Sequence, residues 1–210
     1  MKEDTKDYIY TILKGSVGTI PVAGPVLSEL FGRVFEDPAN KRRENIILGI
    51  SDRVKKLEED GFDLKDLSTN EEFLSIVIQA YNIAMKTHQE EKRIALFNAI
   101  SNTPKLTSID ENEKMMFLNY IDYFNEWHLR ILLFLDSPYD FLSFKSGSRA
   151  SALEIAYPDL KDKSDFYGQI VKDLYNRGLI QFESLFGKVF DATAPGTTEY
   201  GVTFIDYITH

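Results

Sequence analysis

Apolar side chains recur at helical spacing along most of this chain, and this periodicity limits its fold more than any other feature. In residues 27–34, leucine, phenylalanine and valine stand at positions i, i+3, i+4 and i+7, which places them on one side of a helix. Residues 39–60 repeat the pattern, and Gly61 is placed to end that helix. The predicted inward positions of this second helix are Ile47, Ile50, Val54 and Leu57.

Further helices are expected up to residue 124. Ser68 and Thr69, each followed three residues later by a glutamate, form overlapping capping-box patterns that predict a helix start. Neither glycine nor proline interrupts residues 70–102, which therefore form one long helix or two collinear helices broken near His88. Asp110 predicts the cap of the next helix. The apolar sides of these helices carry Phe73, Val77, Ala80, Tyr81 and Ala84, and then Phe117, Tyr120, Ile121 and Phe124.

The sequence changes character after residue 124. Residues 127–135 are apolar on almost every side, which predicts a helix buried between layers. A short helix follows at residues 149–156. Ser164 is placed to cap a strongly amphipathic helix that Gly178 ends. The predicted inward face of that helix carries Phe166, Ile170, Val171, Leu174 and Tyr175.

The end of the chain completes a recognisable order of elements. Residues 179–184 alternate as a strand, and residues 197–208 form a final strand or helix. The segments YNRGLIQFES and TTEYGVTFIDYI resemble the recognition-helix exit and the final segment of the winged-helix superfamily. That resemblance implies a mainly α protein, with a helical bundle at residues 1–124 and a small α+β winged-helix-like domain at residues 125–210.

A second resemblance concerns the whole plan. A stretch like EKRIALFNAISN that precedes NEWHLRILLFL is similar to uncharacterised bacterial proteins of the abortive-infection alpha type. This resemblance implies a role in bacterial defence, including phage defence, or in stress response. It brings no catalytic residues with it.

Composition and charge narrow the functional classes. The hydrophobic content of 43% is ample for a packed core, and the absence of cysteine agrees with a reducing cytoplasm. The N-terminus lacks the pattern of a signal peptide, so we expect a cytoplasmic protein. The net charge is −9, from 24 basic and 33 acidic residues, and this acidic balance disfavours DNA as a partner.

No catalytic motif is present in the sequence. There is no Gly-x-Ser-x-Gly, and none of the three histidines stands at a spacing typical of a metal site. His128 begins the apolar segment and is interpreted as a hydrogen-bonded boundary residue, with a pH sensor or a ligand contact as alternatives. We therefore expect no catalytic residue, no cofactor, no metal site and no enzymatic activity.

The helix before Gly178 is the candidate contact surface of the second domain. If it faces DNA, Gln169 and Asn176 can read adenine edges, and Lys172 or Arg177 can meet guanine or phosphate. Lys188 adds a cation in the region of the wing. Asp165 and Asp173, predicted to point outward as well, would repel a phosphate backbone.

Residues 15–28 form an uncharged segment with three glycines and two prolines. The segment is shorter than the roughly 20 residues that a membrane-spanning helix needs. Pro21 and the missing Lys-Ser/Thr pair argue against a phosphate loop. We expect an apolar hinge between two helices, which packs on the bundle or else contacts a membrane or a partner. The residues that would make this contact are Val17, Ile20, Val22, Val26 and Leu27.

Together these observations predict a non-enzymatic module for protein interaction or self-association. Its partner is expected to be another protein or a second copy of the chain. A winged-helix DNA-binding regulator and a membrane-active effector using residues 15–28 are the alternatives.

Overall fold

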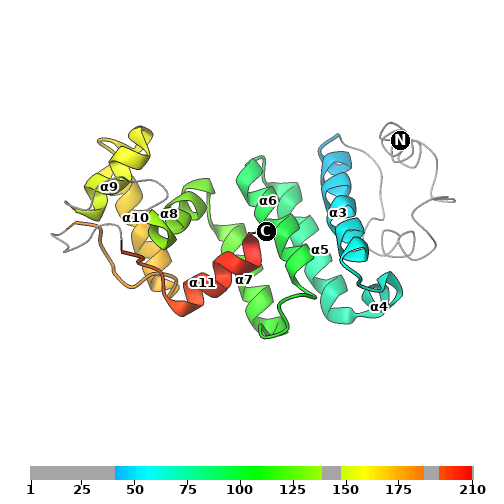
Figure 1. Cartoon of the computed structure of the whole chain (residues 1–210). Coiled ribbons are helices and arrows are strands. Elements are labelled where there is room, and N and C mark those ends of the chain that lie inside the picture. The colour runs from blue at the N-terminus through cyan, green and yellow to red at the C-terminus, as the bar shows by residue number, and fades with distance from the viewer. Residues whose placement is uncertain (1–40, 139–147, 187–193, 210) are drawn as a thin grey trace. The chain divides into compact units, whose positions relative to one another are not determined.

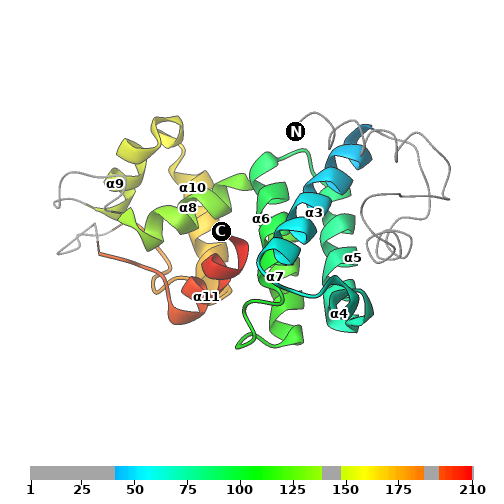
Figure 2. The same cartoon turned by 45° about the vertical axis from the view of Figure 1, so that its right-hand side comes forward.

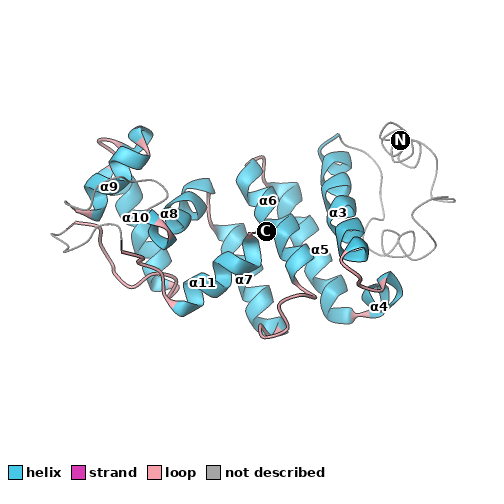
Figure 3. Cartoon of the chain, viewed as in Figure 1, coloured by secondary structure: helices cyan, strands magenta, loops and turns pink. Residues whose placement is uncertain are grey.

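The computed structural model describes residues 41–138, 148–186 and 194–209, and every regular element within these ranges is a helix (Figures 1 and 3). The expected mainly helical fold class is confirmed. The chain divides into two compact units, the second of which runs from Tyr123 to Thr209. None of the described helices is long and apolar enough to cross a bilayer. The predicted apolar hinge, with its five candidate contact residues, lies outside the described residues.

In the first unit, α3 packs against α5 and α6, and α4 packs against α5 (Figure 2). The predicted break near His88 is confirmed, but α5 and α6 are not collinear. They lie side by side because the chain reverses in the short connection between them. The helices are α3 (Lys41–Glu59), α4 (Leu64–Thr69), α5 (Glu71–Lys86), α6 (Glu90–Asn102) and α7 (Glu111–Tyr123), which ends at the boundary of the unit.

The inward side of α3 is a continuous apolar row. Ile46, Ile50, Val54 and Leu57 are completely buried and follow one another at spacings of three or four residues. The prediction placed Ile47 in this row instead of Ile46, but Ile47 is only half-buried. The buried row therefore starts one residue earlier than predicted.

Gly49 permits a close approach between α3 and α6. A Cβ atom at this position would lie 2.3 Å from Cε2 of Phe97. Only a residue without a side chain leaves room for the Phe97 ring over the backbone of α3.

The cap of α5 differs from the prediction. Oδ1 of Asn70 accepts the backbone N–H of Phe73 at 2.8 Å, so the cap is Asn70 and not Ser68 or Thr69. Both hydroxyls belong to the last turn of α4, where they donate to the carbonyl of Lys65 at 2.8 and 3.3 Å. They are occupied by the preceding helix and cannot begin the next one.

Other predicted helix ends are confirmed. Asp110 and Glu113 form a reciprocal capping box: Oδ1 of Asp110 accepts the N–H of Glu113 at 2.9 Å, and the glutamate accepts the N–H of Asp110 at 3.3 Å. Gly61 and Gly178 have φ angles of 94° and 71°. This left-handed conformation suits glycine and ends α3 and α10.

Two lysines of the first unit are buried and bonded to the chain. Nζ of Lys114, whose side chain is 4% exposed, contacts Oε1 of Glu72 at 2.7 Å and the carbonyl of Thr103 at 3.1 Å. Nζ of Lys92 donates to the carbonyl of Asp122 at 2.9 Å. Burial lowers the pKa of Lys92, and the negative charge of Asp122 opposes this change. The two carbonyls lie at the ends of α6 and α7, where backbone acceptors have no partner within their own helix.

The second unit is also built from helices. Its apolar centre includes Phe134, Leu174, Phe204 and Tyr207, all completely buried. The helices predicted over residues 127–135 and 149–156 are confirmed, and the final segment is a helix. The elements are α8 (Glu126–Asp136), α9 (Arg149–Ala156), the 3-10 helix η2 (Pro158–Leu160), α10 (Ser164–Asn176) and α11 (Glu199–Ile208).

The strand predicted at residues 179–184 is wrong. Within the described residues this segment forms a single antiparallel bridge, between Ile180 and Thr197. The pairing stops there because Thr198 caps α11, accepting the N–H of Gly201 at 2.9 Å, and the chain turns into a helix. The described residues therefore do not show the β part of a winged helix.

The inward face of α10 also differs in part from the prediction. Tyr167, Ile170, Val171 and Leu174 are buried, whereas Phe166 and Tyr175 are each 41% exposed. The two aromatic residues lie at opposite edges of the buried face, about 90° from its centre at 100° per residue. Ser164 is the first residue of the helix and not its cap, and no side chain caps this helix at Lys163.

Gly201 gives a test of the packing of α11. A Cβ atom there would lie 2.0 Å from the carbonyl oxygen of Leu179, a backbone atom that cannot rotate away. We expect Gly201→Ala to destabilise the protein by about 2 kcal/mol or more, which lowers the melting temperature by roughly 4–8 °C. The control is Gly168→Ala in α10, where no atom lies within 4 Å of the added Cβ. That change should be neutral or stabilising, and equal melting temperatures for the two variants would contradict the packing described.

Tyr167 gives a test in alkaline solution. Its hydroxyl donates to Oε1 of Glu154 at 2.8 Å, and burial together with this carboxylate raises the pKa of Tyr167 from 10.0 to about 12. Since the folded state holds the proton more tightly, the contribution to stability is full below pH 10 and is lost as the pH rises through 12.

Tyr167→Phe should cost about 1–3 kcal/mol at pH 7 and flatten the decline in stability above pH 10, as measured by urea unfolding at several pH values. Tyr175→Phe, at an exposed position of the same helix, should keep the wild-type profile. An unchanged alkaline decline in Tyr167→Phe would show that this hydroxyl is not the group responsible.

Candidate functional site

Four of the five residues of the second domain that were predicted to contact a partner or DNA lie on α10 or directly after it. Gln169, Lys172 and Asn176 are exposed, as is Asp165 in the first turn. These four residues are spaced at i, i+4, i+7 and i+11 and form one row, which we call the outer stripe of α10. Arg177 follows the helix and is half-buried. Lys188 lies outside the described residues.

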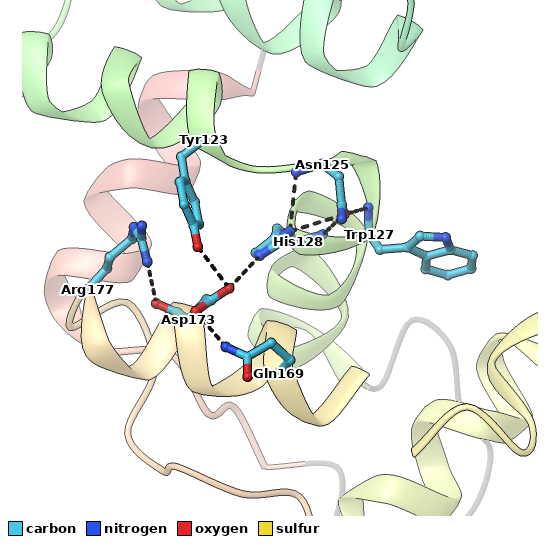
Figure 4. Close-up of polar contacts among 7 residues, drawn as sticks. All are labelled: Tyr123, Asn125, Trp127, His128, Gln169, Asp173 and Arg177. Carbon is cyan, nitrogen blue, oxygen red and sulfur yellow. Dashed lines mark hydrogen bonds and ion pairs between the residues drawn. The ribbon is translucent and has the colours of Figure 1, made fainter. Parts of the chain in front are cut away.

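Asp173 does not belong to the outer stripe, and the prediction that it points outward is wrong. Its side chain is 14% exposed and lies between α10 and the start of α8 (Figure 4). Oδ1 accepts a hydrogen bond from Nε2 of Gln169 at 3.0 Å. Oδ2 lies 3.5 Å from the hydroxyl of Tyr123 and 3.5 Å from Nε2 of His128. A carboxylate in this position is held by donors from three parts of the unit.

His128 is the α8 partner of this carboxylate and also completes the cap of its own helix. Oδ1 of Asn125 accepts the backbone N–H groups of Trp127 and His128 at 2.9 and 3.3 Å. In return, Nδ1 of His128 accepts the backbone N–H of Asn125 at 3.2 Å. The side chain of His128 is 7% exposed. The interpretation of His128 as a hydrogen-bonded boundary residue is confirmed.

Arg177 is held against the aromatic side chains before α8. Its guanidinium lies 4.0 Å from the ring centroid of Tyr123 and 5.3 Å from that of Phe124. Nη1 donates to the carbonyl of Asp173 at 3.1 Å. The Phe124 ring in turn stacks on His128, with centroids 4.7 Å apart and planes at 13°. A cation over an aromatic face is favourable, and this arrangement fixes the direction of Arg177.

Comparison of the chain with family models, with curated proteins and with solved structures gave no match. The resemblances to winged-helix and abortive-infection proteins stay predictions from the sequence. The function is therefore argued from the contacts of α8 and α10.

The cluster around Asp173 is suited to holding two helices together. Both oxygens of Asp173 and both ring nitrogens of His128 are engaged inside the unit. A general base needs a nitrogen or oxygen directed at a substrate proton, whereas these atoms are directed at other groups of the same unit. Sequence reasoning missed the role of Asn125, although its spacing of three residues to His128 is that of a capping box.

Asp173→Ala tests whether this carboxylate holds the cluster together. The change removes the acceptor of Gln169 and the anion next to His128, so we expect a loss of about 1–3 kcal/mol in the free energy of unfolding. Asp165→Ala removes the same group from the exposed first turn of the same helix. It should cost only about 0.3–1 kcal/mol, through the helix dipole. Chemical denaturation of both variants gives the comparison, and equal losses would show that the buried contacts of Asp173 add nothing.

Proposed function

We propose that this chain is a non-enzymatic protein-interaction module, and that it associates with a second copy of itself through the outer face of α10. The observation that carries the proposal is the composition of this face. Phe166 and Tyr175, each 41% exposed, border the outer stripe on its two sides. Exposed aromatic side chains are enriched at surfaces that bind proteins.

Of the two cations predicted on this face, Arg177 is half-buried and only Lys172 is exposed. Nζ of Lys172 lies 3.9 Å from Oε1 of Glu183, and Arg177 lies over Tyr123. Gln169, one of the two residues predicted to read an adenine, donates to Asp173. DNA binding depends on cations that are available to neutralise phosphates. The contacts of α10 therefore favour a protein partner over DNA.

The outer stripe is complementary to itself. Asp165 and Lys172 are seven residues apart, about 10.5 Å along the helix axis, and carry opposite charges. When two copies of α10 pack antiparallel about a twofold axis between Gly168 and Gln169, each Asp165 faces the Lys172 of the other copy. Gly168, beside this axis, has no side chain, and no atom of its own chain lies within 4 Å of a Cβ built there.

The winged-helix organisation of residues 125–210 remains part of the proposal. Three helices, α8, α9 and α10, precede the bridge between Ile180 and Thr197, in the order that the resemblance implies. Winged-helix domains serve both as DNA readers and as dimerisation modules, so this fold is compatible with self-association. A role in bacterial defence or stress response rests on the resemblance to abortive-infection proteins.

Charge exchange on the outer stripe tests the proposed contact. Lys172→Glu and Asp165→Lys each turn two opposite-charge pairs into like-charge pairs and should weaken self-association about tenfold, or about 1.4 kcal/mol. The double variant D165K/K172E restores both pairs with the charges exchanged and should recover most of the affinity. Sedimentation equilibrium measures the change against the monomer mass of 24.1 kDa.

Lys65→Glu is the matched control, since it makes the same charge change at an exposed position of α4. It should leave self-association unchanged. A wild type that stays monomeric up to several hundred micromolar contradicts the proposal, and so does a double variant no better than either single one. Duplex DNA binding at low salt that Lys172→Ala abolishes would instead support the DNA-binding regulator.

A further inference from the structure

His128 has a hydrogen-bond partner at each ring nitrogen, and the two partners demand opposite roles. The backbone N–H of Asn125, 3.2 Å from Nδ1, can only donate. The carboxylate of Asp173, 3.5 Å from Nε2, can only accept. A neutral imidazole has one nitrogen that donates and one that accepts. The neutral ring with its proton on Nε2 meets both of these contacts (Figure 4), but it leaves the unprotonated Nδ1 facing a second acceptor, Oδ1 of Asn125, at 3.1 Å.

A second proton on the ring changes one of these contacts and strengthens the other. Protonated Nδ1 can no longer accept, so the N–H of Asn125 loses its acceptor in the capping box. The new N–H group has an acceptor nearby, because Oδ1 of Asn125 lies 3.1 Å from Nδ1. At the other nitrogen, the hydrogen bond to Asp173 becomes an ion pair.

The charged groups around His128 come from each segment that packs against it. Asp173 of α10 is the nearest anion, and the hydroxyl of Tyr123 shares its Oδ2. The cation Arg177 lies 5.3 Å from the ring centroid of Phe124, which stacks on the imidazole.

Helix α8 itself brings the pair Glu126 and Arg130, 3.6 Å apart, and the positive end of its dipole. The α11 side chain that reaches this ring stack is the apolar Phe204, next to Phe124. Asp173 is thus the group that favours the imidazolium, while the helix terminus and Arg177 oppose it.

We propose that His128 is a proton-dependent latch between α8 and α10. The neutral ring completes the cap of α8. The protonated ring gives up the bond from Asn125 and binds α10 through an ion pair with Asp173. Lowering the pH through the range in which histidine titrates, pH 8 to 5, therefore loosens the first turn of α8 and tightens its hold on α10.

The latch reaches the surface through α10. The carboxylate of Asp173 accepts a hydrogen bond from Gln169, which belongs to the outer stripe. The backbone carbonyl of Asp173 accepts a hydrogen bond from Arg177. The inference concerns the inner side of α10 and goes beyond the proposed self-association. It holds whether or not two copies meet at the outer stripe, and its test does not use association as a readout.

Nuclear magnetic resonance of the full chain tests the latch directly. At pH 8 the ring nitrogens of His128 should show the tautomer protonated at Nε2. As His128 takes up its second proton, the exchange protection factor of the Asn125 amide should fall about fivefold, the factor expected for one ordinary hydrogen bond. In His128→Gln the side-chain amide offers an acceptor and a donor but does not titrate, so the protection factor should stay constant.

His88→Gln is the matched control, because His88 is exposed in the connection between α5 and α6 and should leave the pH dependence as in the wild type. Three results overturn the latch: a ring protonated at Nδ1 at pH 8, a His128 that stays neutral down to pH 5, or an Asn125 amide that keeps its protection while His128 titrates. All three are read from the wild type, so they decide the matter even if His128→Gln does not fold.

Discussion

The second unit depends on how the carboxylate of Asp173 is satisfied. An ionised carboxylate removed from water is costly unless charged or polar donors replace the lost solvent. Here the donors are Tyr123 before α8, His128 in α8 and Gln169 one turn earlier in α10. Moving α8 away from α10 would separate the anion from His128. The cost of that separation gives the two helices one preferred arrangement, which apolar packing alone would specify less strictly.

The periodicity of the sequence predicted the longer helices, but it did not predict α4 or every helix end. Glycine at the end of an apolar row predicted the stops at Gly61 and Gly178, because few other residues accept a positive φ. The alternation of apolar and polar residues in residues 179–184 was not accompanied by a second, independent signal for a strand. Whether an alternating segment becomes a strand depends on a partner of matching length, and here Thr198 directs the partner into a helix. Local sequence does not contain that information.

The sequence predicted some residues of the candidate site correctly and misplaced others. Gln169, Lys172 and Asn176 follow from the amphipathic pattern of α10 and are exposed as expected. Asp173 stands at the edge of the same helical wheel, where the pattern allows either direction. Its direction is decided by His128, which is 45 residues away in the sequence. Contacts with other segments determine whether a residue at the edge of a helix face points inward or outward. The prediction considered each helix separately and therefore placed Asp173 on the wrong side.

The acidic charge of the chain opposes DNA binding by α10 more strongly than it opposes self-association through α10. A net charge of −9 opposes both DNA binding and the meeting of two copies. The outer stripe itself carries one acid and one base, Asp165 and Lys172, so it adds no net charge to the repulsion between copies. Salt screens charges beyond about 8 Å at physiological ionic strength. It weakens phosphate contacts steeply, whereas burial of Phe166 and Tyr175 between two copies is not screened. A contact bordered by aromatic side chains therefore suits an acidic protein better than a contact that depends on cations.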